Sequence, residues 1–357
     1  MKKLTVNIPN REYNILIGND LLKSAGEKIT AISPKAKKAV IVTDENVAPL
    51  YLGKVKDSLE NAGLLVKEII LSQGEETKSL NNLSLLYNEA LSFKVTRTDV
   101  AVALGGGVIG DLTGFFASTI LRGIDFYQIP TTLLAQVDSS VGGKVAVNVP
   151  AGKNLVGAFY QPKLVLIDTD TLSSLSDEIF SDGMAEVIKY GFIKDENLLS
   201  DLEKYKNREN LTPHLSEIIY TCCDIKRKIV ENDEFDTGER MILNFGHTLG
   251  HVIEKQYNFK TYTHGKAVAC GMVLAGILGE KLGISESRIS NRIKTVISSY
   301  GLPDYIKIDK EEIKKTVALD KKSSGKTISF VLLEKAGKTK IKKLTADEIL
   351  NTLKEII

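Results

Sequence analysis

Three of the four histidines, His247, His251 and His264, fall close together in the chain. The first two are four residues apart, a spacing that puts both rings on one helical face, as in zinc-binding helices. A pair of core histidines explains this spacing equally well. The pattern therefore indicates that both rings could be metal ligands, without deciding whether both are.

Glu186 is the carboxylate candidate for the same chemistry. It precedes Lys189 by three residues on a helical face that is otherwise flanked by apolar residues. An acid and a base are costly to bury unless each meets a partner, which favours a functional role. A simple helical ion pair between the two side chains is the alternative.

Two lysines lie next to glycine within apolar sequence. Lys144 lies in Val141–Asn148 and Lys153 lies in Ala151–Gly157. Glycine allows the backbone to approach a ligand closely, so these stretches predict places where backbone and ammonium groups together meet an anion.

Residues 105–110, Gly-Gly-Gly-Val-Ile-Gly, fit the G-x-G-x-x-G pattern, with glycine at Gly105, Gly106, Gly107 and Gly110. They follow a predicted strand and open a predicted helix, where the backbone can approach a pyrophosphate. The pattern departs from the usual fingerprint, because it follows the third strand-like segment and Asp125, the nearest suitable acid, falls inside a predicted strand. A tight turn without a ligand is the alternative.

Polar residues at the ends of other predicted strands also have two interpretations, nucleotide binding and a local structural role. Asp44 comes where a strand ends and a helix begins, so its carboxylate could accept ribose hydroxyls or cap the helix, and capping is favoured for this residue alone. Asp111, Thr131 and Thr132 raise the same alternatives. Together the four residues favour a nucleotide crevice.

The elements that position these residues follow from apolar periodicity. Short apolar runs predict buried strands, and helical spacing lies between them; the runs are near residues 39–43, 64–71, 100–104, 123–129 and 163–168. Such a pattern predicts a parallel sheet covered on both faces. A hairpin is expected before it, from the alternation in residues 4–8 and 13–17.

The rest of the chain is mostly helical in pattern. We therefore expect an α/β N-terminal domain with a mostly parallel, Rossmann-like sheet, residues 1–174, which binds a dinucleotide. A mainly α-helical C-terminal domain, residues 175–357, is expected to bind metal and substrate. Within it, residues 327–333 and 339–344 predict a small ribbon. Thr345 and Glu348 form a capping-box pattern at the start of a last helix.

Composition excludes several classes of protein. The 47 Lys and Arg against 45 Asp and Glu leave a net charge of +2, which argues against a dedicated nucleic-acid partner. The longest apolar run, residues 267–279, is shorter than the roughly 20 residues that span a bilayer, so it predicts a buried helix and no membrane partner. The alternating N-terminus and three cysteines without a C-x-x-C pair predict a cytoplasmic protein with reduced thiols.

With these segments assembled, the sequence resembles the 3-dehydroquinate synthase family. The resemblance rests on residues 105–111, 130–144, 185–191 and 243–251, with His264-Gly265-Lys266. It implies a homodimeric lyase that uses NAD and Zn²⁺, with Co²⁺ as an alternative ion. The implied substrate is a sugar acid phosphate, 3-deoxy-D-arabino-heptulosonate 7-phosphate (DAHP), and the products are 3-dehydroquinate and phosphate. The implied steps are transient oxidation by NAD, phosphate elimination, re-reduction and intramolecular aldol closure.

The resemblance also implies roles for individual residues. The metal ligands of the family match Glu186, His247 and His264 in this sequence. His251 then matches a substrate-contacting residue and not a metal ligand. The remaining substrate-contacting positions match Lys144, Lys153, Asn154, Lys189, Lys226, Arg240 and Asn244, and Asp138 matches a position near the reacting carbon. Nucleotide-side positions match Asp44, Glu75, Lys78, Asp111, Thr131 and Thr132, beside the glycine turn.

Three positions carry open questions. Arg122 resembles a family residue that reaches a neighbouring subunit. Either Lys321 or Lys322 is expected to complete the anion site. Asp236 stands where the family is expected to carry Glu, and its shorter side chain leaves the role of this position in doubt.

Three other functions remain open on sequence alone. A metal-dependent NAD polyol dehydrogenase would use the same cofactors but has no evident need for clustered cations. Another sugar phosphate cyclase would lack the substrate carboxylate that Arg240 and Lys226 are expected to meet. A non-catalytic NAD-binding regulator is the third alternative.

Overall fold

The computed structural model describes residues 1–257, 261–315 and 327–354. The chain divides into two compact units. Unit 1 comprises Met1–Leu175 with Ile219–Phe235, and unit 2 comprises Ser176–Ile218 with Asp236–Ile357. The expected domains, residues 1–174 and 175–357, stay a prediction; in this division Ile219–Phe235 belongs to unit 1. Helix α8 (Leu215–Asn232) carries most of that segment.

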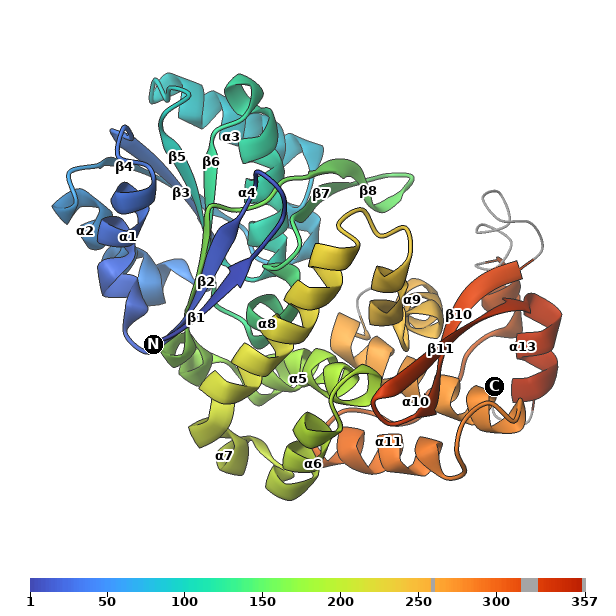
Figure 1. Ribbon diagram of the computed structural model, residues 1–357. Helices are drawn as coiled ribbons and strands as arrows, with labels where there is room; N and C mark the ends of the chain where they lie inside the picture. The colour runs from blue at the N-terminus through green and yellow to red at the C-terminus, as the bar shows by residue number, and fades with distance from the viewer. Residues whose placement is uncertain (258–260, 316–326, 355–357) are drawn as a thin grey trace. The chain divides into compact units, whose positions relative to one another are not determined.

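Unit 1 is built on a seven-stranded sheet in the order β1-β2-β9-β6-β5-β3-β4 (Figure 1). Only β1 is antiparallel, in the expected hairpin with β2. The strands are β1 (Lys2–Val6), β2 (Tyr13–Gly18), β3 (Lys38–Asp44), β4 (Leu65–Leu71), β5 (Val100–Gly105), β6 (Asp125–Pro130) and β9 (Leu164–Asp168). The mostly parallel sheet predicted from the apolar runs is confirmed.

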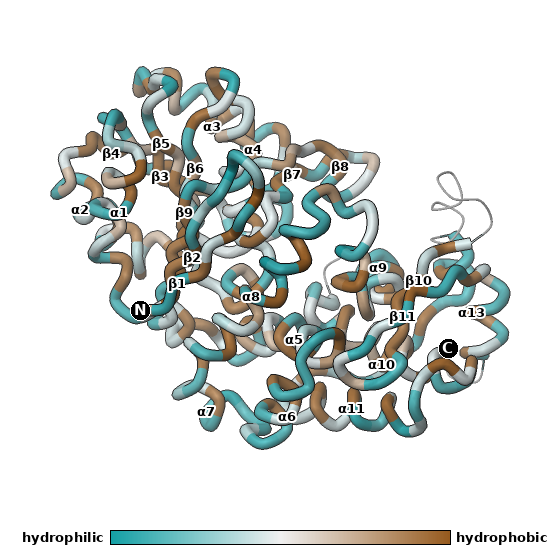
Figure 2. The backbone as a smooth tube through the Cα atoms, viewed as in Figure 1, coloured by the Kyte–Doolittle hydropathy of each residue, from teal (hydrophilic) through white to brown (hydrophobic). Residues whose placement is uncertain are grey.

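Helices cover both faces of this sheet (Figure 1). Its central strands are hydrophobic (Figure 2) and buried along nearly their whole length, as a sheet covered on both faces requires. Ala39 and Ile41 of β3 pack in a core with α1 (Ala25–Ile32) and α2 (Gly53–Asn61). Val40 and Val42 face a second core with α3 (Leu80–Ser92) and α4 (Gly107–Thr119). The chain runs outward from β3 to β4 and then returns to place β5 on the other side of β3. Such a switch point is where open α/β sheets form a crevice for ligands.

A second, two-stranded sheet in unit 1 was not expected from the sequence. Strands β7 (Lys144–Val149) and β8 (Gly152–Phe159) form an antiparallel hairpin. The short loop between them leads into Gly152, and the β8 strand is mostly exposed, so it lacks the clear alternation that marks a half-buried strand. The hairpin carries Lys144, Lys153 and Asn154.

Unit 2 is mainly helical. Its principal helices are α5 (Asp177–Ile193), α6 (Glu196–Tyr205), α9 (His247–Gln256), α10 (His264–Lys281) and α11 (Ile289–Ser299). The expected ribbon is confirmed as β10 (Thr327–Lys335) paired with β11 (Lys338–Thr345). Helix α13 (Ala346–Leu353) begins with the predicted capping box between Thr345 and Glu348.

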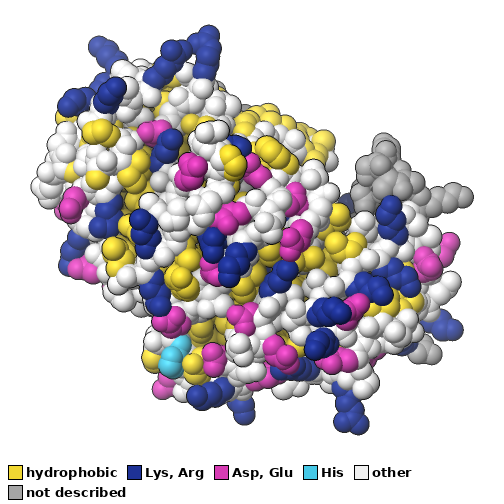
Figure 3. Space-filling view, viewed as in Figure 1, with side chains coloured by type: hydrophobic (Ala, Val, Ile, Leu, Met, Phe, Trp, Pro, Cys, Tyr) yellow, Lys and Arg dark blue, Asp and Glu magenta, His cyan; other side chains and the backbone are white. Residues whose placement is uncertain are grey.

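The longest apolar stretch lies in α10, which is buried along most of its length as predicted. Within residues 1–257, 261–315 and 327–354, no helix is both long and apolar enough to cross a membrane. All three cysteines are buried and lie outside any disulfide. Basic and acidic side chains both occur over the face in Figure 3, in keeping with the balanced charge.

Candidate active site

Helix α5 presents three acids one turn apart, Glu178, Asp182 and Glu186, on one face. The helix begins at Ser176, whose hydroxyl accepts a hydrogen bond from the backbone N–H of Ile179. Glu186 is completely buried and forms an ion pair with the buried Lys189. The ion pair that was one interpretation of the sequence is therefore present. Because the pair also lies beside two imidazoles, a functional role stays a prediction.

The first turn of α10 docks on this acidic face of α5. Asp182 accepts hydrogen bonds from the backbone N–H groups of Gly265 (2.7 Å) and Lys266 (3.3 Å). The Lys266 side chain pairs with Glu178. A Cβ atom on Gly265 would lie 2.0 Å from the carbonyl oxygen of Asp182, so glycine is required for this approach. The contact places His264, the first residue of α10, beside Glu186.

Helix α9 is brought against α10 by small residues. Gly246, with φ of 80°, precedes the helix, and a Cβ there would lie 2.5 Å from Met272. A Cβ on Gly271 would lie 2.0 Å from the carbonyl oxygen of Gly246. This close packing of the two helices brings His247, the first residue of α9, toward the same carboxylate.

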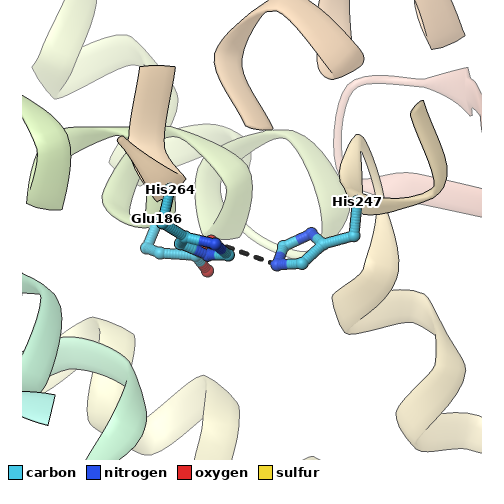
Figure 4. Close-up of side chains that lie close together, drawn as sticks. All are labelled: Glu186, His247 and His264. Atoms are coloured by element: carbon cyan, nitrogen blue, oxygen red, sulfur yellow. Dashed lines mark ion pairs between the residues drawn. The ribbon is translucent and has the colours of Figure 1, made fainter. Parts of the chain in front are cut away.

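Glu186, His247 and His264 consequently point toward one another (Figure 4). The Nε2 atoms of His247 and His264 lie 3.4 and 3.5 Å from Oε1 of Glu186. One ligand atom from each residue lies within 4.8 Å of the others. The Nδ1 atom of His247 lies 3.2 Å from the carbonyl oxygen of Phe245, which turns its Nε2 toward the cluster.

The two imidazoles have opposite pKa shifts although both face Glu186. Burial lowers the pKa of His247 to about 3, and the charge of Lys189 adds to this effect. Burial also opposes protonation of His264, but Glu186 and Glu254 together raise its pKa to about 10. The difference follows from the neighbours, because only His264 lies against a second carboxylate.

The donor set fits a divalent transition metal. Two imidazole nitrogens and one carboxylate oxygen suit Zn²⁺ and related ions, and three protein ligands leave positions open for a reacting molecule, as catalytic zinc sites do. A cation there would also meet the buried negative charge of Glu186. Glu186, His247 and His264 are therefore a candidate metal centre within unit 2.

Among the described residues of unit 2, four other candidates are not among the three converging donors: His251, Arg240, Asn244 and Asp236. His251 follows His247 by one turn of α9, with ring centroids 5.7 Å apart, but its side chain is 60% exposed. Arg240 is buried and Asn244 exposed at the two ends of the 3₁₀ helix Glu239–Asn244. Asp236 is partly buried, with φ of 60°. Lys321 and Lys322 lie outside the described residues.

In unit 1, the glycine turn joins β5 to α4. Gly106 precedes the first turn of α4, and Gly105 accepts a backbone hydrogen bond from Thr131. Close packing alone explains two of these glycines. A Cβ on Gly105 would lie 2.8 Å from Ile109, and one on Gly110 would lie 3.0 Å from Gln128. The tight-turn interpretation thus has direct structural support, and a nucleotide role for the turn stays a prediction.

The polar residues at the strand ends make local contacts. Asp44, at the end of β3, accepts hydrogen bonds from the backbone N–H groups of Asn46 (2.9 Å) and Val47 (3.1 Å). Thr132 accepts one from Ala135 (3.2 Å), and Thr131 is buried. Asp44 and Gly105 end β3 and β5, the strands that flank the switch point of the sheet.

Several nucleotide-side and substrate-side candidates form one polar network in unit 1. The buried Lys78 pairs with Asp111 and donates a hydrogen bond of 2.5 Å to Asn154. Glu75 lies 4.0 Å from Lys153 and accepts a hydrogen bond of 2.7 Å from Asn148. The β7–β8 hairpin thus brings Lys153 and Asn154 to Glu75 and Lys78.

Four further candidates of unit 1 lie outside this network. The buried Lys226 of α8 pairs with the carboxylate of Asp138 at 2.9 Å and donates to its carbonyl oxygen at 2.6 Å. Lys144 is exposed at the start of β7. Arg122 is exposed and has φ of 69°, in a short turn that follows α4.

Sequence reasoning did not single out Asp182, Glu254 or Asn148. Asp182 precedes Glu186 by four residues, and Glu254 follows His251 by three, so both spacings were visible. Their partners in the structure, Gly265 and His264, come from another helix. Spacing along one helix cannot identify such partners.

The fold and the cluster define a class of protein with a Rossmann-like α/β unit and a helical unit that carries a candidate three-donor metal centre. Two family profiles match this chain, "3-dehydroquinate synthase N-terminal" over residues 68–182 and "3-dehydroquinate synthase C-terminal" over residues 183–323. A 3-dehydroquinate synthase of Clostridium botulinum (strain Alaska E43 / Type E3) is 53% identical over 96% of this chain and 98% of the relative. The chain therefore belongs to the 3-dehydroquinate synthase family.

Solved structures of related cyclases share the fold. A 2-deoxy-scyllo-inosose synthase complexed with carbaglucose-6-phosphate, NAD⁺ and Co²⁺ matches with a TM-score of 0.90 and 25% identity over 100% of both chains. A 2-epi-5-epi-valiolone synthase from Streptomyces hygroscopicus subsp. jinggangensis 5008, with NAD⁺ and Zn²⁺ bound, matches with a TM-score of 0.86 and 23% identity over 96% of both chains. Because its sequence identity is low, the second match is evidence for a shared fold alone.

Proposed function

We propose that this chain is a 3-dehydroquinate synthase, a lyase of the shikimate pathway that converts DAHP to 3-dehydroquinate and phosphate. The observation that carries the proposal is the 53% identity to a relative of that name over nearly the whole of both chains. Such a match includes both units and the sequence blocks that bear the candidate residues. The polyol dehydrogenase and the regulator have no comparable support.

Glu186, His247 and His264 would hold the metal, Zn²⁺ or Co²⁺. Support comes from their converging donor atoms and from the Co²⁺ in the related cyclase complex. When bound, the ion acts as a Lewis acid and NAD acts as a reversible hydride acceptor. The protein's contribution is to hold the two Nε2 atoms and the carboxylate in place, with Lys189 offsetting the charge of Glu186.

Unit 1 would bind NAD at its switch point. Gly105, Gly106, Gly107 and Gly110 would allow the pyrophosphate to approach the N-terminus of α4, whose free N–H groups favour an anion. Asp44 would accept ribose hydroxyls with the carboxylate oxygen that its local contacts leave available. Glu75, Lys78, Asp111, Thr131 and Thr132 are proposed to line the nucleotide side.

The substrate carries a carboxylate and a phosphate, so its site needs several cations. We assign this role to five basic side chains: Lys144, Lys153, Lys189, Lys226 and Arg240. The other proposed substrate contacts are Asn154, Asn244 and His251, and Asp138 is proposed to lie near the reacting carbon. Positive groups would stabilise charge that develops on the departing phosphate. Holding the open chain folded favours attack of one end on the other in the aldol closure.

The proposal extends to assembly and location. Arg122 is exposed, which suits a residue that reaches a neighbouring subunit of a homodimer. Buried cysteines outside any disulfide suit a reducing cytoplasm.

The test is phosphate release from DAHP by the purified protein with NAD and Zn²⁺, before and after treatment with a chelator. We expect one phosphate and one 3-dehydroquinate per DAHP, no net NADH, and loss of activity that added Zn²⁺ restores. Net NADH from glycerol-like alcohols without phosphate release would instead identify a dehydrogenase.

The likeness to 2-deoxy-scyllo-inosose synthase makes another sugar phosphate cyclase the second candidate. A hexose phosphate has no carboxylate, so the two substrates can be separated directly. We expect turnover of DAHP and no turnover of glucose 6-phosphate. The reverse result would reject 3-dehydroquinate synthase activity and retain the cyclase class.

A further inference from the structure

Glu254 is a buried carboxylate that lies between two histidines. It is on α9, three residues after His251, and is 6% exposed. Its Oε1 atom lies 3.6 Å from Nδ1 of His264, and its Oε2 atom lies 3.9 Å from Nε2 of His251. Each oxygen thus faces a different ring.

The contact with His264 is on the side of the ring away from Glu186. Nε2 of His264 faces Glu186 at 3.5 Å, and Nδ1 faces Glu254. His247 has the same arrangement, with Nε2 toward Glu186 and Nδ1 beside the carbonyl oxygen of Phe245. Each ring therefore has an oxygen within 3.6 Å of Nδ1, and each turns Nε2 toward Glu186.

An acceptor at Nδ1 decides which nitrogen can bind a metal. A neutral imidazole carries one N–H, and a neighbouring carboxylate or carbonyl oxygen draws that proton to its own side of the ring. The lone pair is then on Nε2. A carboxylate is the stronger acceptor, and its charge also increases the basicity of the ring.

We propose that Glu254 is a positioning residue for both histidines: one oxygen holds His264 with Nε2 turned toward Glu186, and the other orients His251. This inference rests on the proposed metal and substrate roles of His264 and His251. The single carboxylate would connect the metal ligand of α10 with the substrate-contacting residue of α9. It is not a fourth ligand, because it faces Nδ1 of His264 while the candidate ligand atom is Nε2.

The first test compares Glu254→Ala, Glu254→Gln and the parent protein for affinity toward Zn²⁺, measured by competition with a chelator. Loss of an outer partner of a metal-ligating histidine typically weakens metal binding by about 10- to 100-fold, and we expect this for Glu254→Ala. Gln keeps an acceptor oxygen of similar reach, so Glu254→Gln should recover most of the affinity. The Co²⁺ absorption spectrum should change in Glu254→Ala and remain close to the parent in Glu254→Gln.

Glu280→Gln is the matched control. Glu280 is a partly buried acid of α10 that accepts hydrogen bonds from Ser290, and its replacement should leave Zn²⁺ affinity unchanged. If Glu254→Ala does not fold, as judged by circular dichroism, Glu254→Leu takes its place, because Leu fills a similar volume without an acceptor. Parental affinity and spectrum in the folded variant overturn the inference, whereas absence of Zn²⁺ binding by the parent overturns the proposed metal centre itself.

A double-mutant cycle tests the contact with His251 at saturating Zn²⁺. We expect Glu254→Ala to raise KM for DAHP as His251→Ala does, and the double variant to add little, because coupled residues are not additive. Full additivity of the two changes, or an unchanged KM in Glu254→Ala, would overturn the positioning of His251.

Discussion

Asp182 accepts a hydrogen bond of 2.7 Å from the backbone N–H of Gly265, so α5 supplies the cap of the helix that begins at His264. Thr263 precedes α10 but makes no side-chain capping hydrogen bond. Glu186 lies one turn beyond Asp182 on the same helix. This contact between α5 and α10 therefore brings the carboxylate of Glu186 close to the imidazole of His264. The two residues are 78 positions apart in the chain (264 − 186).

Asp182→Ala should therefore weaken both folding and metal binding. Loss of a capping side chain typically costs about 1 kcal/mol in the free energy of unfolding, and the first turn of α10 would no longer be held against α5. Urea unfolding and chelator competition measure the two effects. Asp195 caps α6 through Asn197 and Leu198, so Asp195→Ala should cost similar stability with unchanged Zn²⁺ affinity. Equal Zn²⁺ affinity in both variants would contradict this.

His247→Ala should lower metal occupancy and turnover together. It removes one of the three candidate ligands, so the loss of affinity should exceed the roughly 10- to 100-fold effect of an outer partner. Metal content after dialysis and phosphate release from DAHP provide the two readouts. His214, whose ring stacks on Tyr205, is the control, and His214→Ala should retain metal and activity. Full activity in His247→Ala would refute the ligand assignment.

Gly271→Ala should destabilise the protein because the new methyl group would lie 2.0 Å from the carbonyl oxygen of Gly246. Overpacking typically costs about 1–3 kcal/mol in the free energy of unfolding. Thermal and urea unfolding measure the change. A methyl group on Gly53 in α2 would meet no packing neighbour within 4 Å, so Gly53→Ala should be neutral or slightly stabilising. Equal stability of the two variants would rule out the packing role of Gly271.

Asp99→Asn should reduce stability at neutral pH but not in strong acid. Burial opposes ionisation of Asp99, but hydrogen bonds from the backbone N–H groups of Lys37, Lys38 and Thr96 lower its pKa overall. A carboxyl with a lowered folded pKa stabilises the fold above its unfolded pKa, about 3.9, and this stabilisation is lost as the pH falls through the folded pKa.

The expected loss for Asp99→Asn near pH 7 is about 1–3 kcal/mol in the free energy of unfolding, because partly buried N–H groups would be left poorly satisfied. Urea unfolding from strong acid to neutral pH measures it, with the exposed Asp57→Asn as control. A stability difference that does not shrink toward low pH would exclude an ionised Asp99 as its source.

Much of the architecture could be predicted from local sequence patterns. Continuous apolar runs predicted the parallel strands, since residues on both faces of a covered sheet must be apolar. Helical spacing is a less exact guide to burial: Leu50 shares the apolar spacing of Val55 and Leu59 but is 49% exposed. It lies in a wide turn, Ala48–Leu52, that precedes α2 and breaks the regular spacing.

The β7–β8 hairpin shows why other elements could not be predicted. Its β8 strand is mostly exposed, so burial imposes no alternation on the sequence. The contacts of Lys78 with Asn154 and of Glu75 with Asn148 join residues 76 and 73 positions apart. Contacts between residues so far apart in the chain leave no periodic pattern in the sequence.

By itself, the sequence determined the parallel strands of the main sheet and the helical character of the second unit. It also determined the capping box at Thr345 and the residue types that a metal or an anion would need. Only the tertiary structure decided that His264, with His247, faces Glu186, and that Asp182 and Glu254 support them. The physical reason is that periodicity along the chain reports the burial of each element separately. The convergence of side chains from three helices depends on the close packing that Gly246, Gly265 and Gly271 allow.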